Sequence, residues 1–202
     1  MLFVDHGIFR LVYSNLGRVT PELWRSSQPS PGQVARFAGM GGKTIVNLRG
    51  GREHGSWPLE RDACRRHHIA LAEFVLRSRE APERETMLGM ASFLGSLEYP
   101  VLVHCKSGAD RAGLFAALFM ILRHGASVAE ARRELSPRYG HFKHAKTGIL
   151  DAFLDAYERE GEAEGLGFEE WVRNVYDPEA LTKSFKTTLW SSLVADRLFR
   201  RE

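Results

Sequence analysis

The residues best suited to chemistry in this 202-residue sequence lie in one short segment, residues 104–113. It reads His-Cys-Lys-Ser-Gly-Ala-Asp-Arg-Ala-Gly, so that Arg111 follows Cys105 by six positions. A short apolar run precedes the segment and a long one follows it, which predicts a sharp turn between a buried strand and a buried helix. In such a turn several backbone N–H groups point into one concavity at the positive end of the helix, where they bind an anion.

Cys105 is expected at the mouth of this anion site. The amides and the helix dipole that hold an anion also stabilise a thiolate, which favours a nucleophilic cysteine at neutral pH. Arg111, in the first helical turn, can fold back and bind two oxygens of a phosphoryl group with its planar guanidinium. Gly108 lets the loop backbone approach the phosphate, and Gly113 lets the helix pack closely on the sheet. These residues predict attack of a thiolate on a phosphate ester.

The His-Cys pair, five residues and an arginine, between a strand and a helix, resembles the signature of the protein tyrosine and dual-specificity phosphatase superfamily. The segments 24–29 and 46–50 resemble its compact bacterial and fungal dual-specificity-like branch, so the resemblance spans about residues 20 to 125. It implies a phosphate monoester hydrolase in which Cys105 forms a phosphocysteine intermediate and Arg111 clamps the transition state. No metal and no cofactor are expected. Phosphoproteins, phosphoinositides, phospholipids and phosphosugars remain open as substrates.

The resemblance also assigns supporting roles around the cysteine. His104 is expected to order the loop through hydrogen bonds to its backbone. Many relatives carry Ser or Thr where this sequence has Ala112, and that hydroxyl helps the thiolate leave. Alanine is therefore either tolerated or slows hydrolysis of the intermediate. The phosphate-binding loop comprises Lys106, Ser107, Gly108, Ala109 and Ala112, with Lys106 either adding charge near the phosphate or extending into solvent.

The general acid is the clearest departure from the family pattern. Most relatives carry an aspartate on a separate loop before the cysteine, but no aspartate occurs between Asp62 and Asp110. The segment where that loop should fall, residues 77–84, offers only Glu80 and Glu83. Asp110 lies inside the signature loop, as in the myotubularin-like branch, where the matching aspartate is considered the acid. Asp110 is therefore the first candidate, and Glu80 or Glu83 the second.

The elements that must position these residues follow from hydrophobic periodicity. Strands are expected over 44–48, 69–76 and 100–104, and apolar positions alternate roughly over 18–25. Helices are expected from Ser30 to Gly41, around Cys64, over 81–97, 114–122 and 128–135, and three more follow after 146. This alternation predicts a three-layer α/β domain with a central, mainly parallel sheet. Residues 1–150 would form the phosphatase domain and 151–202 C-terminal helices packed on it. Arg49 would end a strand at the same sheet edge as the signature loop, where it either lines the pocket or is structural.

Composition limits the partners. A formal charge of +3 and a pI near 9.0 are too mild for a nucleic-acid-binding protein but suit anionic ligands such as a phosphorylated protein or a small phosphate ester. Two cysteines, Cys64 and Cys105, provide no disulfide framework and favour a reducing cytoplasm. No leader and no apolar stretch of membrane-spanning length is expected.

Two basic segments have alternative interpretations. The connector 138–146 either meets a polyanionic substrate or forms a solvated face, which is the commoner role of a charge run. Residues 183–201 combine apolar and basic side chains at helical spacing, which suits docking on the domain or a second subunit more often than a membrane surface. Two rival functions remain: a catalytically weak phosphate-binding module, and a rhodanese-like sulfurtransferase, which would not need Arg111.

Overall fold

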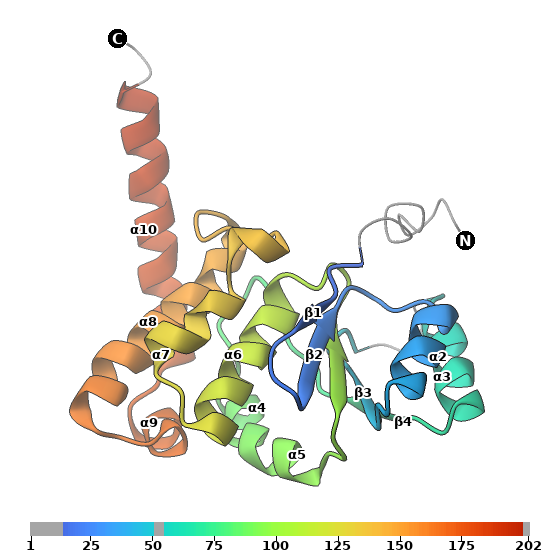
Figure 1. Ribbon diagram of the computed structural model, residues 1–202. Helices are drawn as coiled ribbons and strands as arrows, with labels where there is room; N and C mark the ends of the chain where they lie inside the picture. Colours follow the sequence, from blue (N-terminus) through green and yellow to red (C-terminus); the bar gives the residue numbers. More distant parts are fainter. Residues whose placement is uncertain (1–13, 51–54, 200–202) are drawn as a thin grey trace.

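A computed structural model of the protein describes residues 14–50 and 55–199, with side chains up to residue 188. Its centre is a five-stranded sheet with the order β1-β2-β5-β3-β4 (Figure 1). Only the short β1 is antiparallel to its neighbour; the other pairs are parallel. The strands are β1 (Gly17–Arg18), β2 (Leu23–Ser26), β3 (Thr44–Asn47), β4 (Ala70–Glu73) and β5 (Val101–His104). All four parallel strands therefore end at one edge of the sheet.

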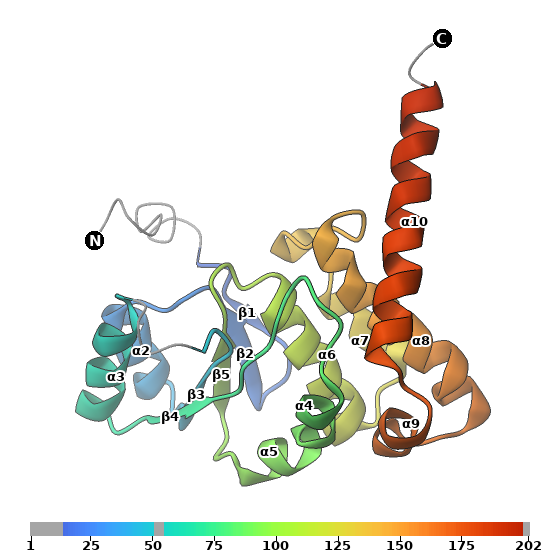
Figure 2. The same cartoon turned by 180° about the vertical axis from the view of Figure 1, so that it is seen from behind.

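Helices cover both faces of this sheet, which makes the predicted three layers (Figure 2). Alternate residues of β5 face opposite layers, as the pleat requires. Leu102 joins the core beneath α2 (Pro31–Gly39) and α3 (Trp57–Arg66), whereas Val101 and Val103 join the larger core around α6 (Asp110–His124). The same larger core includes residues of α4 (Arg84–Leu88) and α5 (Met90–Ser96).

The C-terminal part of the chain extends the layer that contains α6. It consists of α7 (Val128–Ala131), α8 (Ile149–Glu160), α9 (Phe168–Asn174) and α10 (Pro178–Phe199), joined by short 3₁₀ turns. Aromatic side chains hold α8 and α9 together, with Trp171 completely buried among Phe153, Tyr157 and Tyr176. The first turns of α10 lie against α8, and the rest of the helix projects away from the body (Figures 1 and 2).

Local sequence signals account for the ends of several helices, and two of the predicted helices differ in the structure. Ser30 begins α2 with a capping box in which its hydroxyl accepts from Gln33, and Gly125 ends α6 in the left-handed conformation. The helix expected over 81–97 is instead two helices, because Gly89, a poor helix former, stands between α4 and α5. The helix expected over 128–135 changes to a 3₁₀ turn after Ala131.

Among the described residues no helix combines the length and the apolarity needed to cross a bilayer. The last residues on which a membrane-surface role was considered, 189–201, lie outside the described side chains. The membrane-surface role of this segment therefore stays a prediction.

Candidate active site

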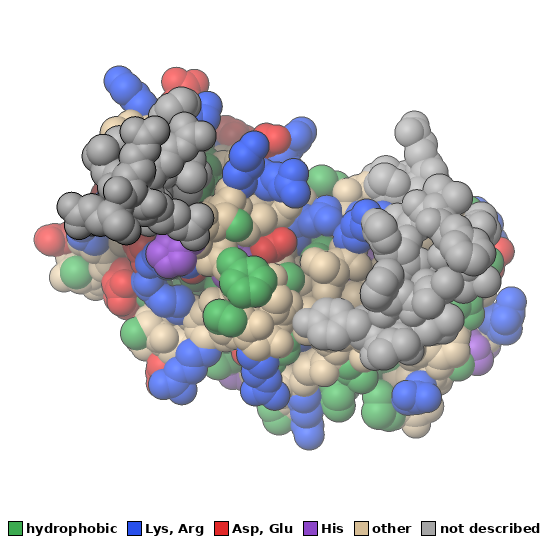
Figure 3. All heavy atoms as spheres, turned by 90° about the horizontal axis from the view of Figure 1, so that it is seen from above, with side chains coloured by type: hydrophobic (Ala, Val, Ile, Leu, Met, Phe, Trp, Pro, Cys, Tyr) green, Lys and Arg blue, Asp and Glu red, His purple; other side chains and the backbone are tan. Residues whose placement is uncertain are grey.

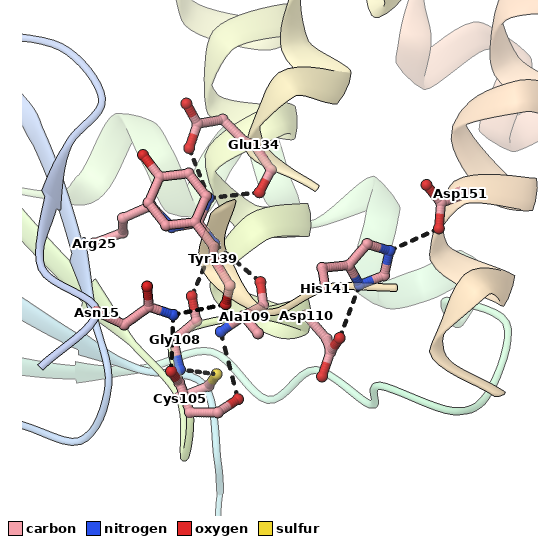
Figure 4. Close-up of polar contacts among 11 residues, drawn as sticks. Asn15, Arg25, Cys105, Gly108, Ala109, Asp110, Glu134, Tyr139, His141 and Asp151 are labelled. Carbon is pink, nitrogen blue, oxygen red and sulfur yellow. Dashed lines mark hydrogen bonds and ion pairs between the residues drawn. The ribbon is translucent and has the colours of Figure 1, made fainter. Parts of the chain in front are cut away.

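The signature loop lies at the edge of the sheet where the parallel strands end. β5 ends at His104, and α6 begins at Asp110, so the loop connects the central strand to the most deeply buried helix. Cys105 is 2% exposed at the base of this loop, and its Sγ accepts a hydrogen bond from the N–H of Gly108 at 3.2 Å (Figure 4). A backbone donor aimed at the sulfur stabilises the thiolate. Lys and Arg side chains gather on this face of the molecule (Figure 3).

Gly108 is required by the geometry of the loop. Its φ is +75°, a conformation that side-chain-bearing residues rarely adopt. A Cβ at this position would lie 2.6 Å from the backbone carbon of Ser26 and 2.6 Å from the nitrogen of Ser27, at the end of β2. The loop therefore packs directly on the β2 backbone, and no other residue type fits there without moving one of them.

Arg25, from β2, holds the loop from behind. Its guanidinium is completely buried and donates from Nη2 to the carbonyls of Gly108 and Ala109, at 2.8 and 2.9 Å. Nη1 donates to the carbonyl and the carboxylate of Glu134, both at 2.6 Å. Tyr139 lies over the guanidinium, 3.8 Å from it to the ring centre (Figure 4). These bonds hold the carbonyls of Gly108 and Ala109 on the side of the loop that faces β2.

His104 and Asn15 support the loop at its two sides. The Nε2 atom of His104 lies 2.6 Å from the carboxylate of Glu60 on α3, and its Nδ1 lies 3.4 Å from the carbonyl of Cys105. Asn47, which pairs with His104 across the sheet, donates to the other oxygen of Glu60 at 3.2 Å. On the other side Asn15 donates to the carbonyls of Ser107 and Tyr139. Both His104 and Glu60 have side chains with no exposed surface.

Asp110 belongs to a chain of three titratable groups that sequence reasoning did not anticipate. His141 lies between two carboxylates, with Nδ1 at 2.8 Å from Asp110 Oδ1 and Nε2 at 2.7 Å from Asp151 Oδ2 (Figure 4). Burial lowers the pKa of His141, but hydrogen bonds with Asp110 and Asp151 outweigh it and raise that pKa from 6.5 to about 9. The prediction that His141 belongs to a solvated basic face is wrong, because its side chain is 1% exposed.

The two glutamates considered as alternative acids lie on the surface. Glu80 and Glu83 pair with Arg77, at 3.4 and 3.7 Å, and more than 60% of each side chain is exposed. Their contacts are confined to the connection between β4 and α4. Of these three candidates, Asp110 alone lies in the signature loop.

The remaining predicted residues have distinct surroundings. Among the described residues, the half-buried Arg111 makes no hydrogen bond or ion pair, so its guanidinium is available to a ligand. Lys106 and Ser107 are exposed, whereas Ala109 and Ala112 are buried. Arg49 follows β3 at the loop edge of the sheet and donates to Gln28 at 2.8 Å and to Ser56 at 3.0 Å. Through these two contacts Arg49 connects the segment that follows β2 with the segment that precedes α3.

A family model described as DSP-PTPase phosphatase fused to NAD+ kinase matches residues 16–149. The chain belongs to this DSP-PTPase family. The matched span contains the complete signature loop, the supporting Arg25 and Tyr139, and His141. The strand and helix that flank the DSP-PTPase loop lie where the sequence predicted them, and the resemblance to the compact bacterial dual-specificity-like branch is confirmed.

Relatives with known names extend this assignment. The dual specificity protein phosphatase TpbA of Pseudomonas aeruginosa strain PAO1 is 32% identical over 161 residues, which cover 75% of this DSP-PTPase chain and 65% of TpbA. The match thus spans less than two thirds of that relative. The crystal structure of a cysteine-to-serine variant of P. aeruginosa TpbA with pTyr has a TM-score of 0.58 at 24% identity, covering 79% of this chain and 91% of that one. The Siw14 catalytic core has a TM-score of 0.54 at 16% identity and shares the fold, covering 88% and 94%.

Proposed function

We propose that this DSP-PTPase chain is a cysteine-dependent phosphatase that hydrolyses phosphate monoesters through a phosphocysteine intermediate. The observation that carries the proposal is the pairing of Cys105 and Arg111 around one loop. The sulfur lies at the base and accepts a backbone hydrogen bond, while the guanidinium on the first turn of α6 has no partner among the described residues. A nucleophile and an unsatisfied planar cation at a helix N-terminus suit a tetrahedral dianion.

The reaction proceeds in two displacements. The Cys105 thiolate attacks phosphorus, the S–P bond forms, and the bond between phosphorus and the leaving oxygen breaks. The loop amides and Arg111 bind the equatorial oxygens, on which charge develops. Water then attacks phosphorus, the S–P bond breaks, and inorganic phosphate leaves while the thiolate is restored.

Asp110 is the proposed general acid. Its carboxyl group belongs to the loop that holds the phosphate, whereas Glu80 and Glu83 are surface residues paired with Arg77. In the first displacement Asp110 gives a proton to the leaving oxygen, and in the second it takes one from the attacking water. Glu80 and Glu83 remain the alternatives for direct comparison by mutation.

Two residues are proposed to support the loop, and a third bears on the step in which the thiolate leaves. His104 orders the loop through its contact with the Cys105 carbonyl, and Arg49 positions the loop edge through Gln28 and Ser56. Ala112 is completely buried and provides no hydroxyl to assist the departing thiolate. Either the second displacement is slow in this chain or the loop amides are sufficient; a pre-steady-state burst of the leaving group distinguishes the two.

The substrate is proposed to be a phosphorylated protein or a small anionic phosphate ester. The relative TpbA is named a dual specificity protein phosphatase, and a variant of it was crystallised with pTyr, so phosphotyrosine is the first substrate to test. Phosphoinositides, phospholipids and phosphosugars are the alternative substrates. The cytoplasmic location stays a prediction.

One assay with matched variants tests the proposal: p-nitrophenyl phosphate hydrolysis by wild type, Cys105→Ser and Cys64→Ser. Burial raises the pKa of Cys64 to about 12, so that thiol is inert at neutral pH and its replacement should leave turnover unchanged. Cys105→Ser should abolish turnover and still bind vanadate. Activity should persist in EDTA, need a reductant and disappear on alkylation.

Three results would contradict it. Substantial turnover by Cys105→Ser would refute the covalent mechanism. Loss of activity on chelation, restored by a divalent ion, would indicate metal-dependent hydrolysis instead. A wild-type chain that binds vanadate but does not turn over would favour the phosphate-binding module.

A further inference from the structure

A buried histidine connects the signature loop to the C-terminal helices. His141 comes from the connector before α8, Asp110 from the first turn of α6, and Asp151 from the first turn of α8. The side chains of His141 and Asp151 are 1% and 5% exposed, and that of Asp110 is 21% exposed. Only the Asp110 end of this chain therefore reaches the surface of the site.

The two contacts require at least two protons in the chain of Asp110, His141 and Asp151. Each N–O contact, at 2.8 and 2.7 Å, requires one hydrogen between nitrogen and oxygen. If both carboxylates are ionised, both hydrogens belong to the ring and His141 is an imidazolium. The raised pKa of His141, about 9, agrees with this state at neutral pH. Burial of an imidazolium is tolerable because both nitrogens have charged partners.

We propose that Asp110, His141 and Asp151 form one acid–base unit, in which His141 positions the Asp110 carboxyl group toward the substrate and Asp151 holds His141. The inference rests on the proposed function. Oδ1 of Asp110 is bound by His141, and among the described residues Oδ2 has no hydrogen-bond partner. Oδ2 is thus the atom that exchanges a proton with substrate. His141 and Asp151 are positioning residues, because neither touches the reacting atoms.

The proton balance of the two displacements follows from this arrangement. The form of the unit that can donate carries one proton more than the ionised form, on Oδ2 of Asp110. In the first displacement this Oδ2–H bond breaks and the leaving oxygen gains the proton. The carboxylate that remains faces the His141 imidazolium, whose charge stabilises it. In the second, the attacking water gives a proton to the same Oδ2, and the carboxyl group is restored. His141 keeps both of its protons throughout.

Charged or titratable groups adjoin the unit along the chain at both of its ends. Asp110 has Cys105 and Arg111 beside it in the signature loop. Beyond Asp151, one turn along α8, Asp155 pairs with Arg132 and with Lys143 of the connector. Asp155 thus provides a control carboxylate on the same helix that has no contact with His141 among those described.

The test compares His141→Asn, His141→Ala, Asp151→Asn and the control Asp155→Asn, on an alkyl phosphate and on p-nitrophenyl phosphate across pH. p-Nitrophenolate leaves without help, whereas an alkoxide needs a proton, and a general acid contributes about 10²- to 10⁴-fold. His141→Ala should slow the alkyl phosphate at least ~10-fold and p-nitrophenyl phosphate far less. The double variant Asp110→Asn/His141→Ala should hydrolyse the alkyl phosphate no more slowly than Asp110→Asn alone, because the two residues act together.

The pH profile separates positioning from general structural damage. Asparagine keeps an N–H near the position of Nδ1 but removes the charge that favours the ionised Asp110. The basic limb of the alkyl phosphate profile should therefore move to higher pH in His141→Asn, and in the same direction in Asp151→Asn. The control Asp155→Asn should leave the limb in place.

The outcomes distinguish this inference from the proposed function. Wild type that fails to turn over, or an active Cys105→Ser, refutes the phosphatase itself. An active wild type whose His141 and Asp151 variants slow both substrates equally, with the basic limb unmoved, refutes the acid–base unit. If His141→Ala does not fold, the pH of the basic limb in His141→Asn and Asp151→Asn decides whether the acid–base unit is upheld or refuted.

Discussion

The charge on His141 should make the stability of the protein depend on pH in a defined window. The pKa of a histidine rises here from 6.5 to about 9 because of the two carboxylates, despite burial. A raised folded-state pKa stabilises the native protein fully below about pH 6.5, and this contribution is lost as pH rises to about 9. Since each tenfold change in proton affinity corresponds to about 1.4 kcal/mol, the contribution amounts to ~3 kcal/mol.

The assay is urea unfolding of wild type and His141→Asn between pH 6 and 10. Asparagine does not titrate, so the difference between the two free energies of unfolding should fall by ~3 kcal/mol across this window and then become constant. Burial raises the pKa of Cys64 to about 12 in the folded chain, but this thiol is present in both proteins, so its contribution cancels from the difference. Asp155→Asn should keep the wild-type slope. A difference that stays flat from pH 6 to 10 would show that His141 is not the cation that its two carboxylate contacts imply.

Five further variants test the loop, its supports and two helix ends. Gly108→Ala should abolish turnover and lower stability, because its Cβ meets the β2 backbone; Gly125→Ala, with a φ of +63° but open space around it, should cost only about 1 kcal/mol and keep turnover. Arg25→Gln should lower the free energy of unfolding by about 3 kcal/mol and weaken vanadate binding, and unchanged vanadate affinity would refute its role in shaping the loop. Arg111→Lys should leave thermal stability unchanged but lose most of kcat, since a point charge cannot replace the guanidinium; a kcat near that of wild type would contradict the clamp. Ser30→Ala should cost about 1 kcal/mol in urea unfolding by removing the cap of α2, with kcat unaffected; a fall in kcat would show that α2 influences the site.

The parts of the structure that depend on neighbouring residues were predictable from the sequence. The β5 strand, the signature loop and α6 follow one another along the chain, and each has a local signal in its periodicity or its glycines. The cap at Ser30 and the stop at Gly125 are likewise local. The interruption at Gly89 was missed because an isolated glycine inside a helical pattern is often tolerated, and only packing decides whether the helix continues.

The residues that hold the site were not predictable in the same way, because their partners lie far along the chain. Arg25 contacts Glu134 across a separation of 109 residues, and His141 contacts Asp110 across 31. Weak signals did exist. Arg25 shares the inward face of β2 with Leu23, and Asp151 follows the apolar Ile149 and Leu150 on α8. A charged residue at a core-facing position needs a partner, although the sequence does not say which one.

The rear attachment of the loop bears on protein design. A loop grafted onto another strand–helix unit would bring Cys105 and Arg111, yet it would leave behind the guanidinium that binds the Gly108 and Ala109 carbonyls. Those carbonyls would then be free to turn toward the anion and repel it. The smallest transferable unit is therefore the loop together with β2 and the segment from Glu134 to Tyr139, pieces that no contiguous fragment supplies.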